Sequence, residues 1–258
     1  YVAFNARRAL SDGVVGEVAL GWVDSDIAYG YDEDWTFEGF HPFGYSSTDL
    51  YLRDVETRTA DVRLLSAPKR GLFDGKVDWV LGLFVLNKEV DFTRDYTYAG
   101  GLFSSDYGAD RVALYGELAT DLTSSWRVSL GLRAEQHESD YEDSADVQFA
   151  PDDDMTGGRL LLERTLASGH LFYASVTRGY KAGGFNTDGS LDADLRLFDP
   201  ETLWNMELGF KGSLMGDRLV LSAALFRMPR RDVQIATSIT RVRQDESAEF
   251  IQYTSNAA

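Results

Sequence analysis

Histidines and carboxylates are the side chains of this 258-residue chain that could catalyse a reaction or bind a metal. The chain has no cysteine, and its histidines do not pair at the spacing of metal ligands: His41, His137 and His170. His137 lies near Glu135, Asp140 and Tyr141, the arrangement nearest to an acid–base or nucleophilic site. Acidic neighbours of a histidine arise freely in so acidic a chain. We therefore predict no enzyme activity, no catalytic residue, no cofactor and no bound metal.

Aromatic side chains are concentrated in a polar segment, residues 29–51. Their density exceeds what an exposed loop usually carries. Such a segment either packs on itself as a folded lid or stacks on a ligand with flat or sugar-like faces. Our hypothesis is the second, with the aromatic residues of the next long link as neighbours. The candidate ligand-binding residues are Tyr31, Trp35, Phe40, His41, Phe43, Tyr45, Tyr96, Tyr98 and Phe103.

The formal net charge of -17 excludes a nucleic-acid partner, because a phosphate backbone would be repelled. Much of the acid lies in two polar segments, residues 24–34 and 140–154. The usual role of such clusters is solvation. The alternative is a divalent cation held between loops or against lipopolysaccharide, although the spacing does not match an EF-hand.

Several segments alternate apolar and polar residues without a slip, as a β-strand with two different faces does. Residues 126–135 read WRVSLGLRAE, and residues 202–211 repeat the pattern. One such strand also fits a soluble sandwich. We predict eleven strands, at residues 2–10, 14–23, 54–66, 77–90, 110–120, 126–137, 157–166, 171–184, 201–213, 218–228 and 249–254.

The links between these strands alternate between short and long. Tight links such as residues 11–13 and 121–125 are followed by long ones such as 24–53, 91–109, 138–156, 187–200 and 229–249. An up-and-down barrel in the outer membrane is built this way, with short turns at one end and long loops at the other. A soluble sandwich has no reason to sort its loops by end. No apolar run approaches the roughly 20 residues of a membrane helix.

In a membrane barrel, one face of each strand contacts lipid and the other faces the interior. We expect these side chains to face lipid: Trp126, Val128, Leu130, Leu132, Trp204, Met206, Leu208 and Phe210. We expect these to face the interior, whose polar residues would mainly be solvated: Arg127, Arg133, Glu135, Asn205, Glu207 and Lys211. An odd number of strands cannot close a single-chain bacterial barrel, so the chain is expected to be part of one, with unpaired edges near residues 1–10 and 250–254.

Residues 173–211 carry the most specific pattern, YASVTRGYKAGGFN followed by a polar loop and FDPETLWNMELGFK. This stretch resembles the late barrel strands of TonB-dependent outer-membrane receptors, in which one strand climbs to the cell surface and a P-E-T-x-x-N-Y-E-L-G-x-K strand returns. On the residues alone, the first half is either a strand that ends on glycines or a segment whose Arg178 and Lys181 face an acidic interior or plug. The motif residues are Arg178, Gly179, Tyr180, Lys181, Gly183, Gly184, Phe185 and Asn186.

The resemblance implies an all-β, antiparallel transmembrane barrel of which residues 1–258 form a part, about half of the family's 22 strands. The family's signal peptide and plug domain have no counterpart in these residues. It implies a place in the cell outer membrane and energy-coupled uptake of a scarce nutrient, such as an iron–siderophore complex. The implied partners are the TonB complex, reached through the plug segment, outer-membrane lipid and lipopolysaccharide, and a small ligand such as a metal chelate. The cargo itself does not follow.

Two other functions share parts of this pattern. A passive porin or adhesin-like barrel would have the same strands and loops, but the motif of residues 173–211 argues against it. A soluble β-sheet binding domain would have to cover its apolar strand faces with other protein.

Overall fold

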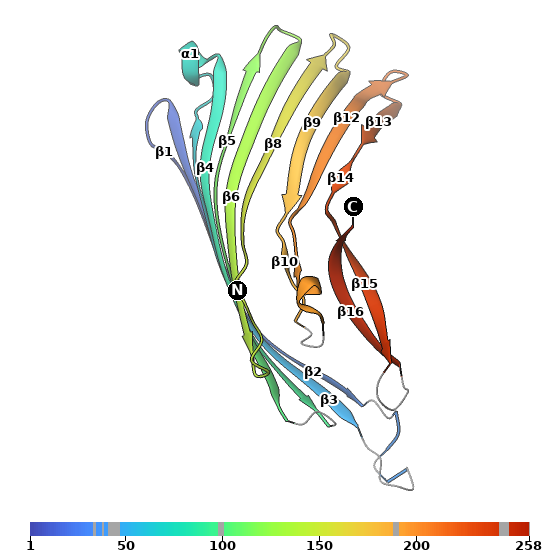
Figure 1. Ribbon diagram of the computed structural model, residues 1–258. Coiled ribbons are helices and arrows are strands. Elements are labelled where there is room, and N and C mark those ends of the chain that lie inside the picture. Colours follow the sequence, from blue (N-terminus) through green and yellow to red (C-terminus); the bar gives the residue numbers. More distant parts are fainter. Residues whose placement is uncertain are drawn as a thin grey trace.

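The computed structural model describes residues 1–32, 35–37, 39–40, 47–97, 101–187, 191–242 and 248–257. Its elements are nearly all strands, in one curved wall (Figure 1). The strands are β1 Val2–Ala9, β2 Val14–Asp32, β3 Thr48–Ser66, β4 Val77–Tyr96, β5 Phe103–Asp121, β6 Trp126–Asp143, β7 Gln148–Phe149, β8 Asp152–Thr165, β9 Leu171–Lys181, β10 Gly184–Phe185, β11 Leu197–Phe198, β12 Glu201–Leu214, β13 Leu219–Arg227, β14 Arg230–Arg231, β15 Val233–Val242 and β16 Ala248–Ala257. A short helix, α1 Leu72–Gly75, and a 3₁₀ turn, η1 Ala193–Leu195, complete the list.

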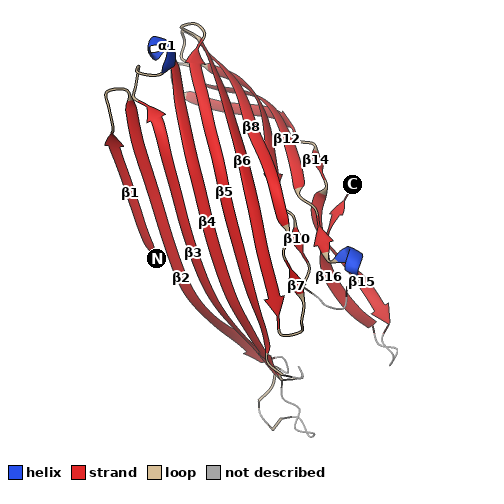
Figure 2. Ribbon diagram, turned by 60° about the vertical axis from the view of Figure 1, so that its left-hand side comes forward, coloured by secondary structure: helices blue, strands red, loops and turns tan. Residues whose placement is uncertain are grey.

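Neighbouring long strands pair antiparallel in chain order, β1-β2-β3-β4-β5-β6-β8-β9-β12-β13 (Figure 2). This confirms the predicted up-and-down sheet, which is open: β1 and β13 form its edges. The second edge differs from the expected one, because residues 250–254 belong to β16 and pair with β15 in a separate hairpin.

Connection length sorts only partly by end. The links at residues 10–13, 67–76, 122–125, 166–170 and 215–218 lie at the upper end in Figure 1. At the lower end the β9–β12 connection is long, but the β4–β5 link of residues 97–102 is shorter than the upper link of residues 67–76. In the turn of residues 166–170, Gly169 has a φ of 79°, a conformation that glycine adopts without a steric penalty.

One face of the sheet is apolar. Leu130 lies opposite Leu118 and Leu160 on the adjacent strands, and Leu208 lies opposite Leu225. Leu130 is 45% exposed and Leu208 60% exposed, so no second sheet covers them within the described chain. A stacked sandwich is thereby ruled out, and the predicted division of residues between the two faces is confirmed. We call this the apolar face and the opposite one the polar face.

The polar face is held together by ion pairs and hydrogen bonds rather than left to solvent. Arg133 contacts Glu135 at 2.6 Å, and Tyr173 donates a hydrogen bond to Glu207 at 2.5 Å. The predicted interior residues lie here: Arg127, Arg133, Glu135, Asn205, Glu207 and Lys211.

The strands are longer than predicted at the end opposite the short turns. β2 continues to Asp32, β4 to Tyr96 and β6 to Asp143, and β14 and β15 occupy most of the link expected at residues 229–249. The prediction was wrong there because carboxylates replace apolar residues on the apolar side beyond the apolar band, while aromatic residues stand on the opposite side. The alternation of the band is thereby interrupted in the sequence, although the backbone ladder continues.

Carboxylates face one another on the apolar side of these extensions. One row crosses five strands with each residue directly opposite the next, and all of its members are exposed: Asp26, Asp54, Asp91, Asp106 and Glu142. None of the five forms an ion pair with a described residue. Like charges directly opposite each other destabilise a sheet. The described parts of the acid-rich segments therefore lie mostly in strands with repelling charges, rather than in the loops that their composition suggested.

Leu130 is the middle apolar residue of β6, so a charge there should lie near the centre of the bilayer. Leu130→Arg should lower the free energy of unfolding in lipid bilayers by about 2 to 4 kcal/mol, whereas Leu130→Ile should change it little. Urea titration followed by tryptophan fluorescence measures both. An arginine variant as stable as the parent would contradict a lipid-facing position.

Neutralising one member of the carboxylate row should have the opposite effect. Asp54→Asn removes repulsion from Asp26 and Asp91 and should raise the unfolding free energy by about 0.2 to 1 kcal/mol at low salt. The gain should shrink as salt is added. A loss of stability would show that Asp54 has a favourable partner.

Candidate functional site

Aromatic rings line the polar face near the ends of the strands that lie far from the short turns. Tyr29 stacks on Tyr51 with ring centroids 4.7 Å apart and planes 2° from parallel. Tyr51 also contacts Tyr31 at 6.2 Å and Phe92 at 6.0 Å, and Phe92 contacts Phe103 at 6.2 Å. We call the following residues the aromatic array: Tyr29, Tyr31, Tyr51, Phe92, Tyr96 and Phe103.

Strand register brings the array together from four strands. Tyr29 of β2 lies opposite Tyr51 of β3, Tyr51 lies opposite Arg94 of β4, and Arg94 lies opposite Phe103 of β5. All share the face of Asp61, which lies on β3 and is hydrogen-bonded by Tyr115. Side-chain direction along a strand has a period of two, so one register fixes every ring on the same face.

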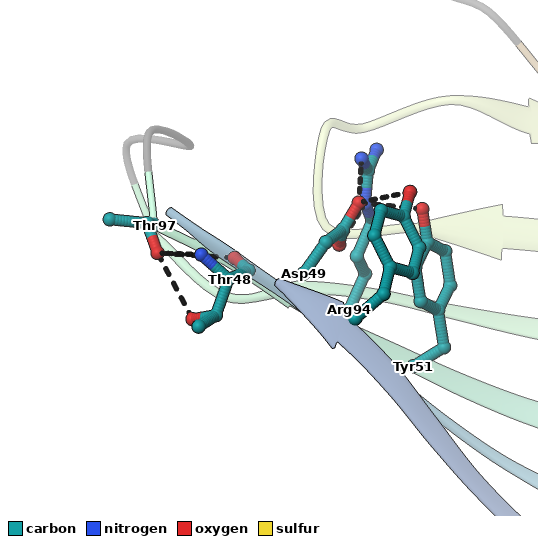
Figure 3. A network of polar contacts seen from close by, with 6 residues as sticks. Thr48, Asp49, Tyr51, Arg94 and Thr97 are labelled. Carbon is teal, nitrogen blue, oxygen red and sulfur yellow. Dashed lines mark hydrogen bonds and ion pairs between the residues drawn. The ribbon is translucent and has the colours of Figure 1, made fainter. Parts of the chain in front are cut away.

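A buried ion pair holds the array. The side chain of Asp49 is 0% exposed and accepts hydrogen bonds from Arg94 Nε at 2.8 Å and Nη2 at 2.5 Å. The hydroxyls of Tyr51 and Tyr31 donate to Asp49 Oδ2 at 2.7 and 3.3 Å. The Arg94 guanidinium also lies over the rings of Tyr51 and Tyr96, 5.2 and 5.1 Å from their centroids. Figure 3 shows the Asp49 and Arg94 side chains meeting beside the Tyr51 ring.

Charge in this network is fixed at physiological pH. Hydrogen bonds from Arg94 lower the pKa of Asp49 to about 2, against the opposing effect of its burial. Burial, followed by hydrogen bonding, raises the pKa of Tyr51. Asp49 lies near the end of β3 remote from the short turns, beyond the roughly ten residues that a strand needs to cross the bilayer. The Asp49 carboxylate is therefore ionised, and Tyr51 is a neutral donor to it.

A second aromatic cluster involves the motif of residues 178–186. Phe185 stacks on Phe149 at 5.0 Å and contacts Tyr141 at 5.2 Å and Tyr107 at 6.1 Å. Tyr107 and Tyr141 lie on the polar face, so the connection that carries Phe185 lies over that face. We call the described part of this connection, residues 182–187 and 191–200, the strap.

The two motif glycines permit a close approach within the strap. A Cβ on Gly183 would lie 2.6 Å from the carbonyl oxygen of Phe198, and one on Gly184 would lie 2.7 Å from the Phe198 ring. The Gly183 N–H also donates to Asp153 on β8 at 2.9 Å. These glycines have a structural role, whereas Gly179 has room for a side chain.

Amide side chains join the strap to the β15–β16 hairpin. Asn186 accepts from the Thr254 N–H and donates to the Thr254 carbonyl, both at 2.8 Å, as a neighbouring strand would. Asn256 makes the equivalent pair of bonds with Asp199, at 2.7 and 2.9 Å. Gln234 donates to the carbonyl of Ala182 at 2.7 Å.

The charged and aromatic motif residues separate between the faces. Arg178 lies opposite Trp204 and hydrogen-bonds Thr156, which places it on the apolar side. Of the two alternatives for this segment, the one in which Arg178 faces the interior is wrong, because Arg178 has the same alternation as Val176. Tyr180 reaches over Gly157 to bond Glu135 at 3.0 Å and Arg133 at 3.1 Å, and Lys181 lies opposite Glu201.

The predicted ligand-binding residues have three outcomes. Tyr31, Tyr96 and Phe103 belong to the array, on strands rather than on the loops where they were expected. Trp35 and Phe40 lie in the link after β2, where Trp35 is 89% exposed and Phe40 contacts Phe37 at 5.3 Å. No contact between these two and the array is found among the described residues. His41, Phe43, Tyr45 and Tyr98 lie outside the described residues.

The candidates chosen from the sequence left out Tyr29 and Tyr51, although both delimit the aromatic segment of residues 29–51. Asp49, Phe92 and Arg94 were missed altogether. Sequence reasoning also took the polar face for a merely solvated surface, which the array contradicts. The available signal was the alternation of Tyr29 and Tyr31 at odd positions, which continues the β2 pattern beyond residue 23.

Two features are absent among the described residues. No group of three or more His, Asp or Glu side chains there has a geometry that could hold a metal ion. No described helix is both long and apolar enough to cross a membrane.

Asp49→Asn tests whether the buried pair organises the array. The change leaves the half-buried Arg94 without its carboxylate and should lower stability by about 1 to 3 kcal/mol, with faster hydrogen exchange in the outer parts of β3 and β4. The folded pKa of Asp49 is depressed, so its contribution is complete above about pH 4 and is lost as the pH falls through about 2. Asp54→Asn on the opposite face is the control. Equal exchange in both variants would contradict the role of Asp49.

Comparison with known proteins gives one consistent family. The family model described as "TonB dependent receptor-like, beta-barrel" matches residues 4–258. The chain is 25% identical over 267 residues to the pesticin receptor of Yersinia pestis, covering 94% of this chain and 39% of that protein. The pesticin receptor of Yersinia enterocolitica is 26% identical over 259 residues, covering 91% and 38%. The chain thus spans about two fifths of the length of these relatives.

Solved structures share the fold. The ferric yersiniabactin uptake receptor FyuA of Yersinia pestis superposes with a TM-score of 0.71 at 19% identity, over 92% of this chain and 38% of that one. The ferric-catecholate import receptor Fiu of E. coli gives 0.64 at 14% identity, over 97% and 42%. With a family model that matches almost its whole length, the chain belongs to the TonB-dependent receptors of the outer membrane, as part of their β-barrel domain.

Proposed function

We propose that the chain forms the ligand-binding half of an outer-membrane receptor that imports a ferric siderophore or a similar metal chelate. The aromatic array carries the proposal. It places rings from four strands on the polar face, at the end of the wall from which the long connections extend. In a barrel of this family the polar face is the interior and the long connections face the medium.

The exposure and rigidity of the array suit a ligand with flat faces. Tyr29 is 49% exposed and Tyr31 48% exposed, so each offers a free ring surface. The Asp49–Arg94 pair holds these rings before a ligand arrives, and a surface that is ordered in advance loses less entropy on binding. Aromatic contacts contribute about 1 kcal/mol each.

The names of the relatives support a metal chelate as the cargo. The similar structures include uptake or import receptors for ferric yersiniabactin and for ferric catecholates, and a receptor bound to ferripyoverdine. A copper transporter, OprC, has the same fold, so the metal is a part of the proposal that needs its own test.

Energy coupling is the second part of the proposal. Family membership favours a TonB-driven receptor over the passive porin and over the soluble domain. Transport would then require the TonB complex.

Alanine substitutions in the full-length receptor test the array. Tyr31→Ala and Tyr96→Ala should each weaken binding of the ferric chelate about fivefold, which is the loss of one stacking contact. Phe226→Ala is the matched control, because Phe226 is an exposed polar-face aromatic on β13, away from the array. Binding of radioiron-labelled chelate to outer membranes with equal receptor content is the measurement. Unchanged affinity in both tyrosine variants would remove the array from the binding site.

A further inference from the structure

A cavity of about 360 Å³ lies on the polar face, away from the aromatic array. Its volume falls within the range of small-molecule sites, roughly 300 to 1,000 Å³. Arg111 of β5 and His137 of β6 line the wall side, Gly183 and Phe198 belong to the strap, and Thr254 belongs to the β15–β16 hairpin. Three separate parts of the chain therefore enclose one space.

The carboxylates around this cavity already have partners. Glu135 contacts Arg133 at 2.6 Å and accepts a hydrogen bond from Tyr180 at 3.0 Å. Asp153 accepts the N–H of Gly183 at 2.9 Å, and Glu201 is paired with Arg230. None of these charges needs a cation from the cavity.

Two cations on the cavity wall retain unused donors. Arg111 approaches Glu135 only at 4.0 Å, which is too long for a hydrogen bond. Lys181 lines the cavity and forms no ion pair within 4.0 Å with a described residue. Two such cations beside one cavity favour an anionic ligand.

His137 also contributes a polar side chain to the cavity wall. Its side chain is 95% buried, and its Nδ1 has no hydrogen-bond partner among the described residues. The ring is hydrogen-bonded to the backbone of Asp110. When one ring nitrogen donates to a carbonyl, the other accepts, so Nδ1 is a buried acceptor in the wall behind the cavity.

We infer that this cavity binds a small polycarboxylate anion, with Arg111 and Lys181 donating to carboxylate oxygens. In the receptor proposed above, on which this identification of the ligand class rests, the anion is a free carboxylate of the chelate. The strap closes the site on one side through Gly183 and Phe198.

Citrate is the probe, because it is a small anion with three carboxylates. Isothermal titration of citrate into the purified full-length receptor should give saturable binding. Arg111→Gln and Lys181→Gln should each weaken it about tenfold or more, the loss of a hydrogen bond to a charged group. Arg159→Gln is the matched control, since Arg159 pairs with Glu117 at 3.2 Å and does not line the cavity.

The outcomes of these measurements separate the cavity site from the proposed function. An absence of citrate binding to the parent receptor, or equal weakening by Arg159→Gln, overturns the cavity site. Radioiron uptake by cells is measured in parallel with the same variants. Citrate binding that depends on Arg111 in a receptor that imports no ferric chelate would leave the cavity site intact and overturn the proposed function.

Discussion

The ladder of backbone hydrogen bonds between neighbouring strands is the constraint on which this structure depends. Hydrocarbon offers no partner for an N–H or C=O group, so each strand that crosses it must pair on both sides. The ladder runs without a break from β2 to β12 through residues that face each other in fixed register. Because register also sets side-chain direction, the same ladder sorts Leu130 to lipid and Glu135 to the interior.

Strand length positions the proposed ligand site. β2, β3 and β5 have 19 residues each, about twice what a bilayer requires. The excess holds the aromatic array and the Asp49–Arg94 pair on a rigid sheet instead of on loops. Sites that are built on regular elements are positioned more precisely than sites on loops. The strap and its amide bonds to the hairpin extend the same rigidity across the polar face.

Alternation of apolar and polar residues made the membrane-spanning part of the strands predictable. Its interruption beyond the apolar band hid the outer parts of the strands. The segment of residues 126–135 shows its two faces in the sequence, and the predicted starts at residues 77, 126, 171 and 201 match β4, β6, β9 and β12. Beyond the apolar band, Asp91 and Asp106 look like loop residues although they are paired across a ladder. The array was only partly predictable, because Asp49 and Arg94 are 45 residues apart and meet through register.

Energy-coupled import of a ferric chelate is the central claim, and uptake by living cells tests it most directly. Cells that carry the full-length receptor should be given radioiron-labelled siderophore, with TonB either intact or deleted. The account predicts surface binding in both strains and accumulation inside the cell only when TonB is present. Equal accumulation in the two strains would contradict it, because the barrel would then behave as a passive pore.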